Sequence, residues 1–115
     1  MLRTMCKSKI RGAVITATML HYEGSIGIDR KIMAAADMLP WERVQVVNLS
    51  NGARLETYVI EEKAGSGIIS LKGPAARLGQ VGDEVIIISY VAVCEEEAHK
   101  LQPKVVRLKA KNKLE

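Results

Sequence analysis

The sequence predicts one mainly β domain spanning residues 1–115, built as a closed barrel or a sandwich. Short runs rich in Val, Ile and Thr recur along the 115 residues, and Gly, Asn, Asp and Pro separate them. The apolar fraction of 48% is ordinary for a globular domain, but Phe is absent and aromatic residues make up only 3%. The core is therefore expected to be aliphatic, and closure into a barrel would remove exposed strand edges.

Six runs have the length and composition of strands. They lie at residues 13–19, 43–48, 53–59, 68–71, 85–93 and 105–108. Asn51-Gly52 is the strongest hairpin signal in the chain, and it joins the second run to the third. Gly65-Ser66-Gly67 comes just before the fourth run. Gly82-Asp83 precedes the most hydrophobic run, which is expected to be a central strand.

Three short helices are expected outside these strands. Asp29 is suited to cap a helix that runs from residue 30 to about residue 39, where Pro40 would end it. Residues 73–78 begin with Gly-Pro and predict a tight turn that leads into a short helix, since Pro fits a first helical turn. Residues 95–101 are the third candidate.

The net charge of +4 raises the question of a nucleic-acid partner. Much of the excess lies in the C-terminal tail, in Arg107, Lys109, Lys111 and Lys113. No aromatic residue is interleaved with these cations, so a platform for stacking bases is missing, and an anionic small molecule explains the charge equally well. Nucleic-acid binding by a non-catalytic barrel, through this basic tail, is therefore kept as an alternative function.

The sequence indicates no membrane segment, secretion signal or metal site. No apolar run approaches the roughly 20 residues that span a bilayer, and Met1-Leu2-Arg3-Thr4 lacks the features of a signal peptide. A cytoplasmic location without a membrane partner is expected. Cys6 and Cys94 lack Cys-x-x-Cys spacing and the two histidines are scattered, which favours free thiols and no bound metal.

The dipeptide Gly24-Ser25 suggests a bond that the chain cleaves itself. A serine hydroxyl that attacks the preceding carbonyl turns the peptide bond into an ester. Elimination from the ester and loss of ammonia would leave a pyruvoyl group at the new N-terminus, which is an electrophilic carbonyl made from the chain's own atoms. Gly24 has no Cβ, so its backbone can adopt strained angles that leave the carbonyl open to attack.

The strand expected at residues 53–59 carries two side chains suited to an anionic substrate. Alternation places Arg54 and Tyr58 on one face and Thr57 on the other. Arg54 offers a planar, permanently charged fork for a carboxylate, and Tyr58 offers a phenol that can donate a proton. The same pattern is normal for a strand at a surface. Lys9 is either a second contact for an anion or a surface lysine.

Several blocks of the chain together resemble the pyruvoyl-dependent aspartate 1-decarboxylase family. They are Met1-Leu2-Arg3-Thr4-Met5, Leu20-His21-Tyr22-Glu23-Gly24-Ser25, Asn51-Gly52-Ala53-Arg54 with Thr57-Tyr58, and Gly82-Asp83 before the long apolar run. The resemblance covers essentially the whole chain. It implies a six-stranded double-psi β-barrel with short peripheral helices, assembled as a homotetramer with active sites between neighbouring subunits.

The resemblance also implies a zymogen that cleaves itself between Gly24 and Ser25. The products would be a β-chain of residues 1–24 and an α-chain of residues 25–115, which begins with a pyruvoyl group derived from Ser25. That cofactor, without metal or pyridoxal phosphate, would form a Schiff base with L-aspartate and yield CO₂ and β-alanine for pantothenate biosynthesis. The resemblance gives Thr57 the task of polarising the Gly24 carbonyl during cleavage.

The substrate contacts follow from the same resemblance. Lys9 and Arg54 would bind the carboxylates of aspartate, and Tyr58 would protonate the carbanion carbon. The Gly73-Pro74-Ala75 turn would contact the substrate through its backbone, although Pro74 has no N–H to offer. A pyruvoyl decarboxylase for another amino acid is kept as a second alternative, because glutamate differs by one methylene, which is worth about 1–3 kcal/mol in a pocket.

Two positions depart from the family pattern. The family commonly has His where this chain has Arg11, and Asn where it has Lys72. That Asn is associated with the Gly24 carbonyl in the precursor, so we predict that cleavage survives with Lys72 but is slow. The sequence leaves open whether a maturation factor is needed.

Overall fold

The computed structural model describes residues 1–115, and its main element is one β-sheet. The strands are β1 (Leu2–Val14), β2 (Ala17–Met19), β3 (Ser25–Asp29), β4 (Arg43–Asn48), β5 (Arg54–Glu62), β6 (Ile69–Lys72), β7 (Glu84–Cys94), β8 (Lys104–Lys109) and β9 (Lys113–Leu114). The α-helices are α1 (Arg30–Ala35) and α2 (Glu95–Lys100), and the 3-10 helices are η1 (Gly73–Arg77) and η2 (Ala110–Asn112). The mainly β class with short helices is therefore confirmed.

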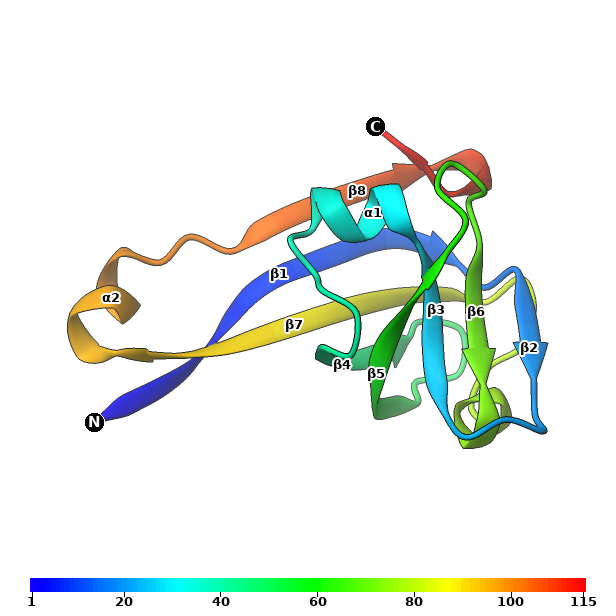
Figure 1. The fold of residues 1–115 in the computed structure, drawn as a ribbon, viewed down its shortest axis with the longest axis horizontal. Coiled ribbons are helices and arrows are strands. Elements are labelled where there is room, and N and C mark those ends of the chain that lie inside the picture. The colour runs from blue at the N-terminus through cyan, green and yellow to red at the C-terminus, as the bar shows by residue number, and fades with distance from the viewer.

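Six strands form a closed ring. The hydrogen-bonded order is β2-β6-β3-β5-β4-β7-β1-β8-β9. β1 and β2 belong to one bent segment, interrupted only at Ile15 and Thr16, whose N–H groups donate to the carbonyls of Asp83 and Ile69. This bent segment lies beside β7 at one end and beside β6 at the other, so it closes the series into a barrel and leaves β8 and β9 outside (Figure 1).

Aliphatic side chains fill the barrel. Nineteen buried apolar residues form one cluster. Buried and more exposed positions alternate along β4 and β7, as expected for strands with one face on a core. In the absence of Phe, isoleucines fill much of the space, and seven of them are at most 1% exposed: Ile10, Ile15, Ile26, Ile28, Ile32, Ile69 and Ile87.

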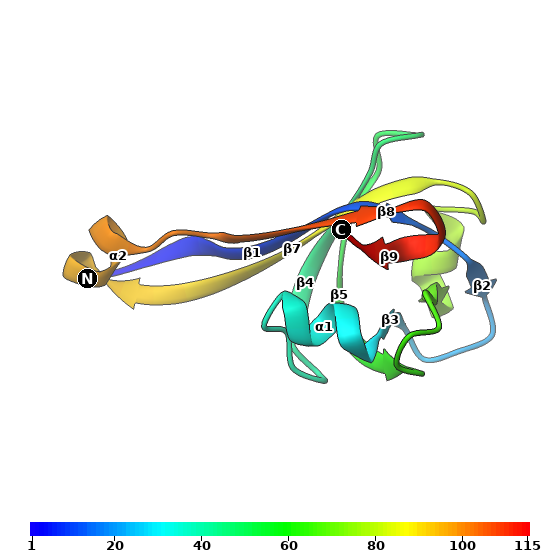
Figure 2. The same cartoon turned by 90° about the horizontal axis from the view of Figure 1, so that it is seen from above.

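An arm extends from the barrel. The first residues of β1 pair with the last residues of β7, from Leu2 opposite Cys94 to Cys6 opposite Tyr90, and α2 lies at the tip (Figure 1). Seen from above, this arm is a thin layer (Figure 2). The molecule measures 42 × 28 × 24 Å along its principal axes. Since α2 has no buried residue, main-chain pairing rather than a core holds the arm.

Two predicted strand assignments need correction. The strand expected at residues 13–19 is wrong, because the chain bends at Ile15 and Thr16 and a long strand, β1, precedes the bend. β3 was not predicted, since its five residues include Gly27 and lack a regular alternation. The hairpin of β4 and β5 and the strands β6, β7 and β8 confirm the other predictions.

The helices agree in place with the predictions, but the first is shorter than expected. α1 ends at Ala35 rather than near residue 39, because Asp37 has a φ of 55° that no α-helix accommodates. The Asp29 side chain accepts the N–H of Lys31, which confirms Asp29 as the cap of this helix. η1 and α2 lie where short helices were expected. No helix of the chain is long and apolar enough to cross a bilayer.

Candidate active site

Gly24 and Ser25 stand at the start of β3 in an unusual environment. Gly24 has a φ of 124°, a conformation that side chains with a Cβ rarely adopt. Ser25 is fully buried, and its Oγ atom has no hydrogen-bond partner. Buried hydroxyls in proteins are nearly always hydrogen-bonded, and the exceptions are found at strained or catalytic positions. The geometry therefore fits a serine kept free for a reaction at the adjoining carbonyl.

The turn that begins η1 packs directly against this bond. β6 pairs with β3 so that Lys72 lies opposite Ser25. The next residue, Gly73, has a φ of 72°, and a Cβ added to it would lie 2.7 Å from the N and Cα of Gly24. Only glycine fits this contact, so Gly73 holds the turn against the backbone of Gly24.

A cavity of about 400 Å³ opens beside Gly24. Its lining comes from the loop before β3, from β5 and from η1 with the residue after it: Glu23, Gly24, Leu55, Glu56, Thr57, Tyr58, Pro74, Ala75 and Leu78. Five of the predicted site residues are among them, namely Gly24, Thr57, Tyr58, Pro74 and Ala75. Residues far apart in the sequence thus share one cavity beside Gly24, the residue that precedes Ser25.

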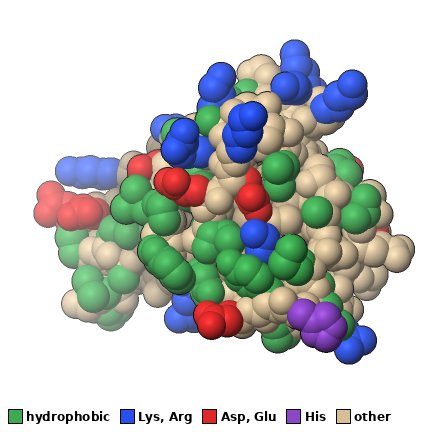
Figure 3. All heavy atoms as spheres, turned by 45° about the vertical axis from the view of Figure 1, so that its right-hand side comes forward, with side chains coloured by type: hydrophobic (Ala, Val, Ile, Leu, Met, Phe, Trp, Pro, Cys, Tyr) green, Lys and Arg blue, Asp and Glu red, His purple; other side chains and the backbone are tan.

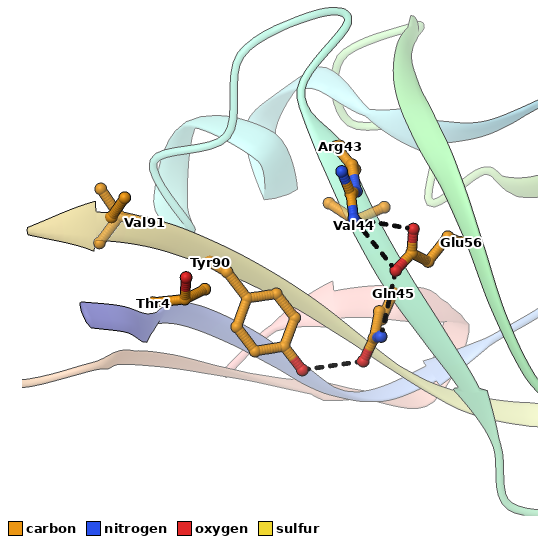
Figure 4. A pocket seen from close by; sticks show the side chains of 8 residues that line it. Thr4, Arg43, Val44, Gln45, Glu56, Tyr90 and Val91 are labelled. Atoms are coloured by element: carbon orange, nitrogen blue, oxygen red, sulfur yellow. Dashed lines mark hydrogen bonds and ion pairs between the residues drawn. The ribbon is translucent and has the colours of Figure 1, made fainter. Parts of the chain in front are cut away.

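Of the other four predicted site residues, Ser25 and Gly73 adjoin Gly24 as described above, whereas Lys9 and Arg54 lie apart from this cavity. Arg54 is exposed, and its Nη1 donates to Oε1 of Gln45 at 2.8 Å. The hydroxyl of Tyr90, which comes from β7 where the arm begins, donates to the same Gln45 oxygen at 2.9 Å (Figure 4). Gln45 and Tyr90 line a second hollow, of about 530 Å³. Lys9 is half-buried in β1, which pairs with β7 and β8 rather than with β3.

Asp29 fixes the far end of β3. Its carboxylate accepts the N–H groups of Lys31 at 2.8 Å, Gly65 at 3.0 Å and Gly67 at 2.8 Å. Burial raises the pKa of this carboxyl, but the three backbone donors outweigh burial and hold the pKa below its usual value. Asp29 is therefore ionised at neutral pH and ties the 65–67 turn to the end of the strand that Ser25 begins.

Many of the cationic side chains gather at one edge of the molecule (Figure 3). Lys and Arg side chains crowd the upper edge of the face in Figure 3, where α1, η2 and β9 lie, and hydrophobic side chains occupy the middle of that face. No Trp or Tyr occurs in residues 104–115, so the basic tail presents no surface on which bases could stack. No group of three or more His, Cys, Asp or Glu side chains is gathered closely enough to hold a metal ion.

Known proteins identify the family. The model of the family described as aspartate decarboxylase matches residues 1–115. The chain belongs to the aspartate decarboxylase family. It is 53% identical to the aspartate 1-decarboxylase of Thermoanaerobacter pseudethanolicus over 113 residues, which cover 98% of this chain and 97% of the relative. The aspartate 1-decarboxylases of Listeria welshimeri and Bacillus subtilis are 55% and 53% identical over 115 residues, all of this chain and 91% of each relative. The protein is thus a carboxy-lyase.

In this aspartate decarboxylase family member, the structure adds an aromatic contact that the sequence did not indicate. The rings of Trp41 and Tyr58 are stacked, with centroids 5.1 Å apart and planes at 23°. Trp41 has a φ of 73°, which is uncommon for a bulky residue, and its N–H donates to the carbonyl of Val59 at 2.7 Å. The sequence marked Trp41 only as the residue after Pro40 at a helix end. No pattern in the sequence predicts that Trp41 adopts a positive φ and lies beside the strand that carries Tyr58.

A second group missed by sequence reasoning surrounds Lys72. Its Nζ forms an ion pair with Oε2 of Glu62 at 3.1 Å, and the hydroxyl of Ser70 donates to the same oxygen at 2.7 Å. The Nζ also lies 5.1 Å from the centroid of the Tyr22 ring. Lys72 was singled out as a departure from the family pattern, but Glu62 carried no signal, because its contact depends on how β5, β3 and β6 pair.

Proposed function

We propose that this chain decarboxylates L-aspartate to β-alanine with a pyruvoyl group made from Ser25, and that the product serves pantothenate biosynthesis in the cytoplasm. The chain belongs to the aspartate decarboxylase family, and one observation on its structure supports this particular chemistry. The buried Ser25 hydroxyl has no hydrogen-bond partner and follows a glycine whose φ is 124°. Buried serine hydroxyls normally donate to a neighbouring carbonyl. The Ser8 hydroxyl is also buried without a partner, but only that of Ser25 directly follows a glycine with such a φ.

Self-cleavage begins with attack of the Ser25 oxygen on the carbonyl carbon of Gly24. The hydroxyl proton leaves the oxygen, the C–N bond breaks, and the nitrogen of Ser25 takes a proton, which leaves an ester. Loss of the Cα proton of Ser25 then breaks the ester C–O bond, so that Gly24 ends the β-chain, residues 1–24, as a carboxylate. Water adds to the resulting dehydroalanine and ammonia leaves, which gives the pyruvoyl end of the α-chain, residues 25–115.

The residues around the scissile bond fit this group. Gly24, held against Gly73, exposes its carbonyl without a Cβ, and Thr57 lines the same cavity with a hydroxyl suited to polarise that carbonyl. The pyruvoyl group supplies an electron-accepting carbonyl that takes up the electrons of the departing carboxylate. Tyr58, in the same cavity, is the proposed proton donor to the product carbon, and the Gly73-Pro74-Ala75 turn bounds the substrate.

Lys9 and Arg54 are the proposed contacts for the two carboxylates of aspartate. Neither lines the cavity beside Gly24 of the same chain. Arg54 nevertheless has a free edge, since only its Nη1 is engaged, by Gln45. We therefore propose that a neighbouring subunit completes each site, in a homotetramer, so that Arg54 of one chain meets Ser25 of another. A bidentate arginine suits a carboxylate that stays anchored while the other leaves.

Intact-mass spectrometry and an assay of β-alanine test the proposal together. The native protein should give two chains, the larger one lacking one ammonia relative to a serine N-terminus. Ser25→Ala should give one uncut chain and no β-alanine. An uncut native chain that binds nucleic acid would favour the non-catalytic alternative, and a higher kcat/KM with glutamate than with aspartate would favour another amino acid as substrate.

A further inference from the structure

Glu62, Ser70 and Lys72 gather along β3, the strand that Ser25 begins. Ile26 and Ile28 of β3 belong to the core, so the alternate positions of β3, which include Ser25, point to the opposite face. Residues directly opposite each other in an antiparallel pair share a face. Ser25 lies opposite Lys72, and Gly27 lies opposite Ser70. The side chains of Lys72 and Ser70 therefore share the face of the Ser25 hydroxyl.

Gly27 makes the space that Glu62 occupies. A Cβ at Gly27 would collide with the carboxylate of Glu62 and would lie 2.5 Å from Oγ of Ser70. The Glu62 carboxylate therefore reaches across β3 from the neighbouring strand β5 to the side chains of β6. This placement brings the carboxylate to Lys72 and Ser70.

The ion pair is largely shielded from water. The side chains of Lys72 and Glu62 are only 16% and 19% exposed. A shielded pair interacts more strongly than a surface pair, and removing one partner leaves a poorly solvated charge. The Lys72 ammonium is thus held between the Glu62 carboxylate and the ring of Tyr22, two residues before Gly24, whose centroid is 5.1 Å away.

We infer that Glu62 is a positioning residue for self-cleavage, because it holds the ammonium of Lys72, the residue paired with Ser25, on the side of β3 that carries the Ser25 hydroxyl. Negative charge develops on the carbonyl oxygen of Gly24 when Ser25 attacks. Ser70 orients the Glu62 carboxylate by its hydrogen bond. A fixed cation near a developing oxyanion lowers the barrier, since no reorganisation is needed during the reaction. The inference rests on the proposed self-cleavage and names the residues of this chain that promote it.

The test compares rates of self-cleavage, followed by intact mass from freshly made precursor. Lys72→Met should slow cleavage by about a hundredfold or more, the size of effect seen when one oxyanion stabiliser is removed. Lys72→Arg keeps the cation and should stay much closer to the native rate. Glu62→Gln should slow cleavage about tenfold, since the ammonium loses its fixed position, and Ser70→Ala should slow it about two- to fivefold.

Glu61→Gln is the matched control. Glu61 is the adjacent residue of β5 and pairs with Arg30 at 4.0 Å, on the other side of the strand from Glu62. Its removal should leave the cleavage rate unchanged. Melting temperatures of all variants are measured in parallel, and Ser70→Ala, the mildest change, keeps the test decisive if Glu62→Gln folds poorly.

Exchanging the charges of Glu62 and Lys72 distinguishes a role in cleavage from a role in stability alone. Glu62→Lys combined with Lys72→Glu restores an ion pair but puts a carboxylate where the ammonium was. A folded double variant that cleaves at the native rate would show that the pair only holds the structure, and it would overturn the inference. Equal rates for the native chain and Glu62→Gln would overturn it as well. A native chain that never cleaves would instead refute the proposed self-cleavage itself.

Discussion

The barrel and the arm share two strands but are held together in different ways. In β7, Val85 and Ile87 at the barrel are at most 1% exposed, whereas Tyr90 is 39% exposed. In β1, Ile10 is fully buried and Leu2 is 69% exposed. The same pair of strands therefore passes, through a register shift between Cys6 and Ser8, from a packed core into a thin arm with solvent on its sides.

The two regions therefore have different tasks: the barrel stabilises the fold, and the arm helps to complete the proposed site. Burial of apolar surface stabilises the barrel, which carries Gly24 and Ser25. The arm has no core of its own, but Tyr90, at its base, holds Gln45 where Gln45 meets Arg54. We therefore expect changes in the barrel to affect stability and self-cleavage, and changes in the arm to affect substrate binding.

The largest contrast should come from truncating one apolar side chain in each region. Ile87→Ala leaves a cavity in the barrel and should lower the free energy of unfolding by about 2–5 kcal/mol. Leu2→Ala removes an exposed side chain and should change it by less than about 0.5 kcal/mol. Urea unfolding followed by circular dichroism measures both. A cost for Leu2→Ala close to that of Ile87→Ala would mean that the arm is buried in the assembled protein.

A smaller effect in the barrel should depend on pH. Asp29→Asn removes a carboxylate that accepts three backbone N–H groups, and at pH 7 it should cost about 1–3 kcal/mol. Because the folded pKa of Asp29 is lowered, its contribution is present above the ordinary value of 3.8 and is lost as pH falls through the folded pKa.

Unfolding of the native protein and Asp29→Asn is compared at pH 7 and near pH 3. The difference between the two should shrink at the lower pH. A constant difference at both values would mean that hydrogen bonding by the neutral side chain, rather than its charge, holds the 65–67 turn.

The link from the arm to the proposed substrate contact should show in KM. Gln45→Met removes the oxygen that accepts from both Arg54 and Tyr90, and it should raise the KM for aspartate up to about tenfold, since a hydrogen bond to a charged group contributes about 1.5 kcal/mol or more. Tyr90→Phe should have a weaker effect in the same direction. Steady-state kinetics on fully cleaved protein measures KM, and a slower self-cleavage of Tyr90→Phe, the variant in the arm, would contradict the division between arm and barrel.

The smallest effect should be that of Trp41. Trp41→Asn replaces a bulky residue at a φ of 73° by one that tolerates this conformation, but it removes the ring stacked on Tyr58. Relief of strain and loss of a stack worth about 0.5–1.5 kcal/mol nearly cancel, so stability should change little. Because the stacked ring helps to hold Tyr58 in place, Trp41→Asn should lower kcat about two- to threefold at an unchanged melting temperature. Trp41→Phe keeps an aromatic ring and should retain the native kcat.

Local sequence patterns predicted most of the barrel. The hairpin at Asn51-Gly52, the strands that flank it and the Asp29 cap depend on interactions between near neighbours, which a pattern of residue types reveals. The bend at Ile15 and Thr16 was not predicted, because the N–H groups of these residues donate to carbonyls of Asp83 and Ile69, which are distant in the chain. α1 was expected to be longer for a similar reason, since apolar spacing continues beyond the point where tertiary packing turns the backbone.

The candidate site divides in the same way. Gly24, Ser25 and Tyr58 were predicted from their residue types and positions, whereas the task of Thr57 was predicted only from the resemblance to the family. The sequence by itself determined the aliphatic, mainly β class and most of its turns, and it predicted which residues react. Only the tertiary structure decided that the Ser25 hydroxyl is buried without a partner and that Glu62 reaches Lys72 across Gly27. Pairing of strands sets these contacts, and the order of a sheet is fixed by packing of the whole chain rather than by any short segment.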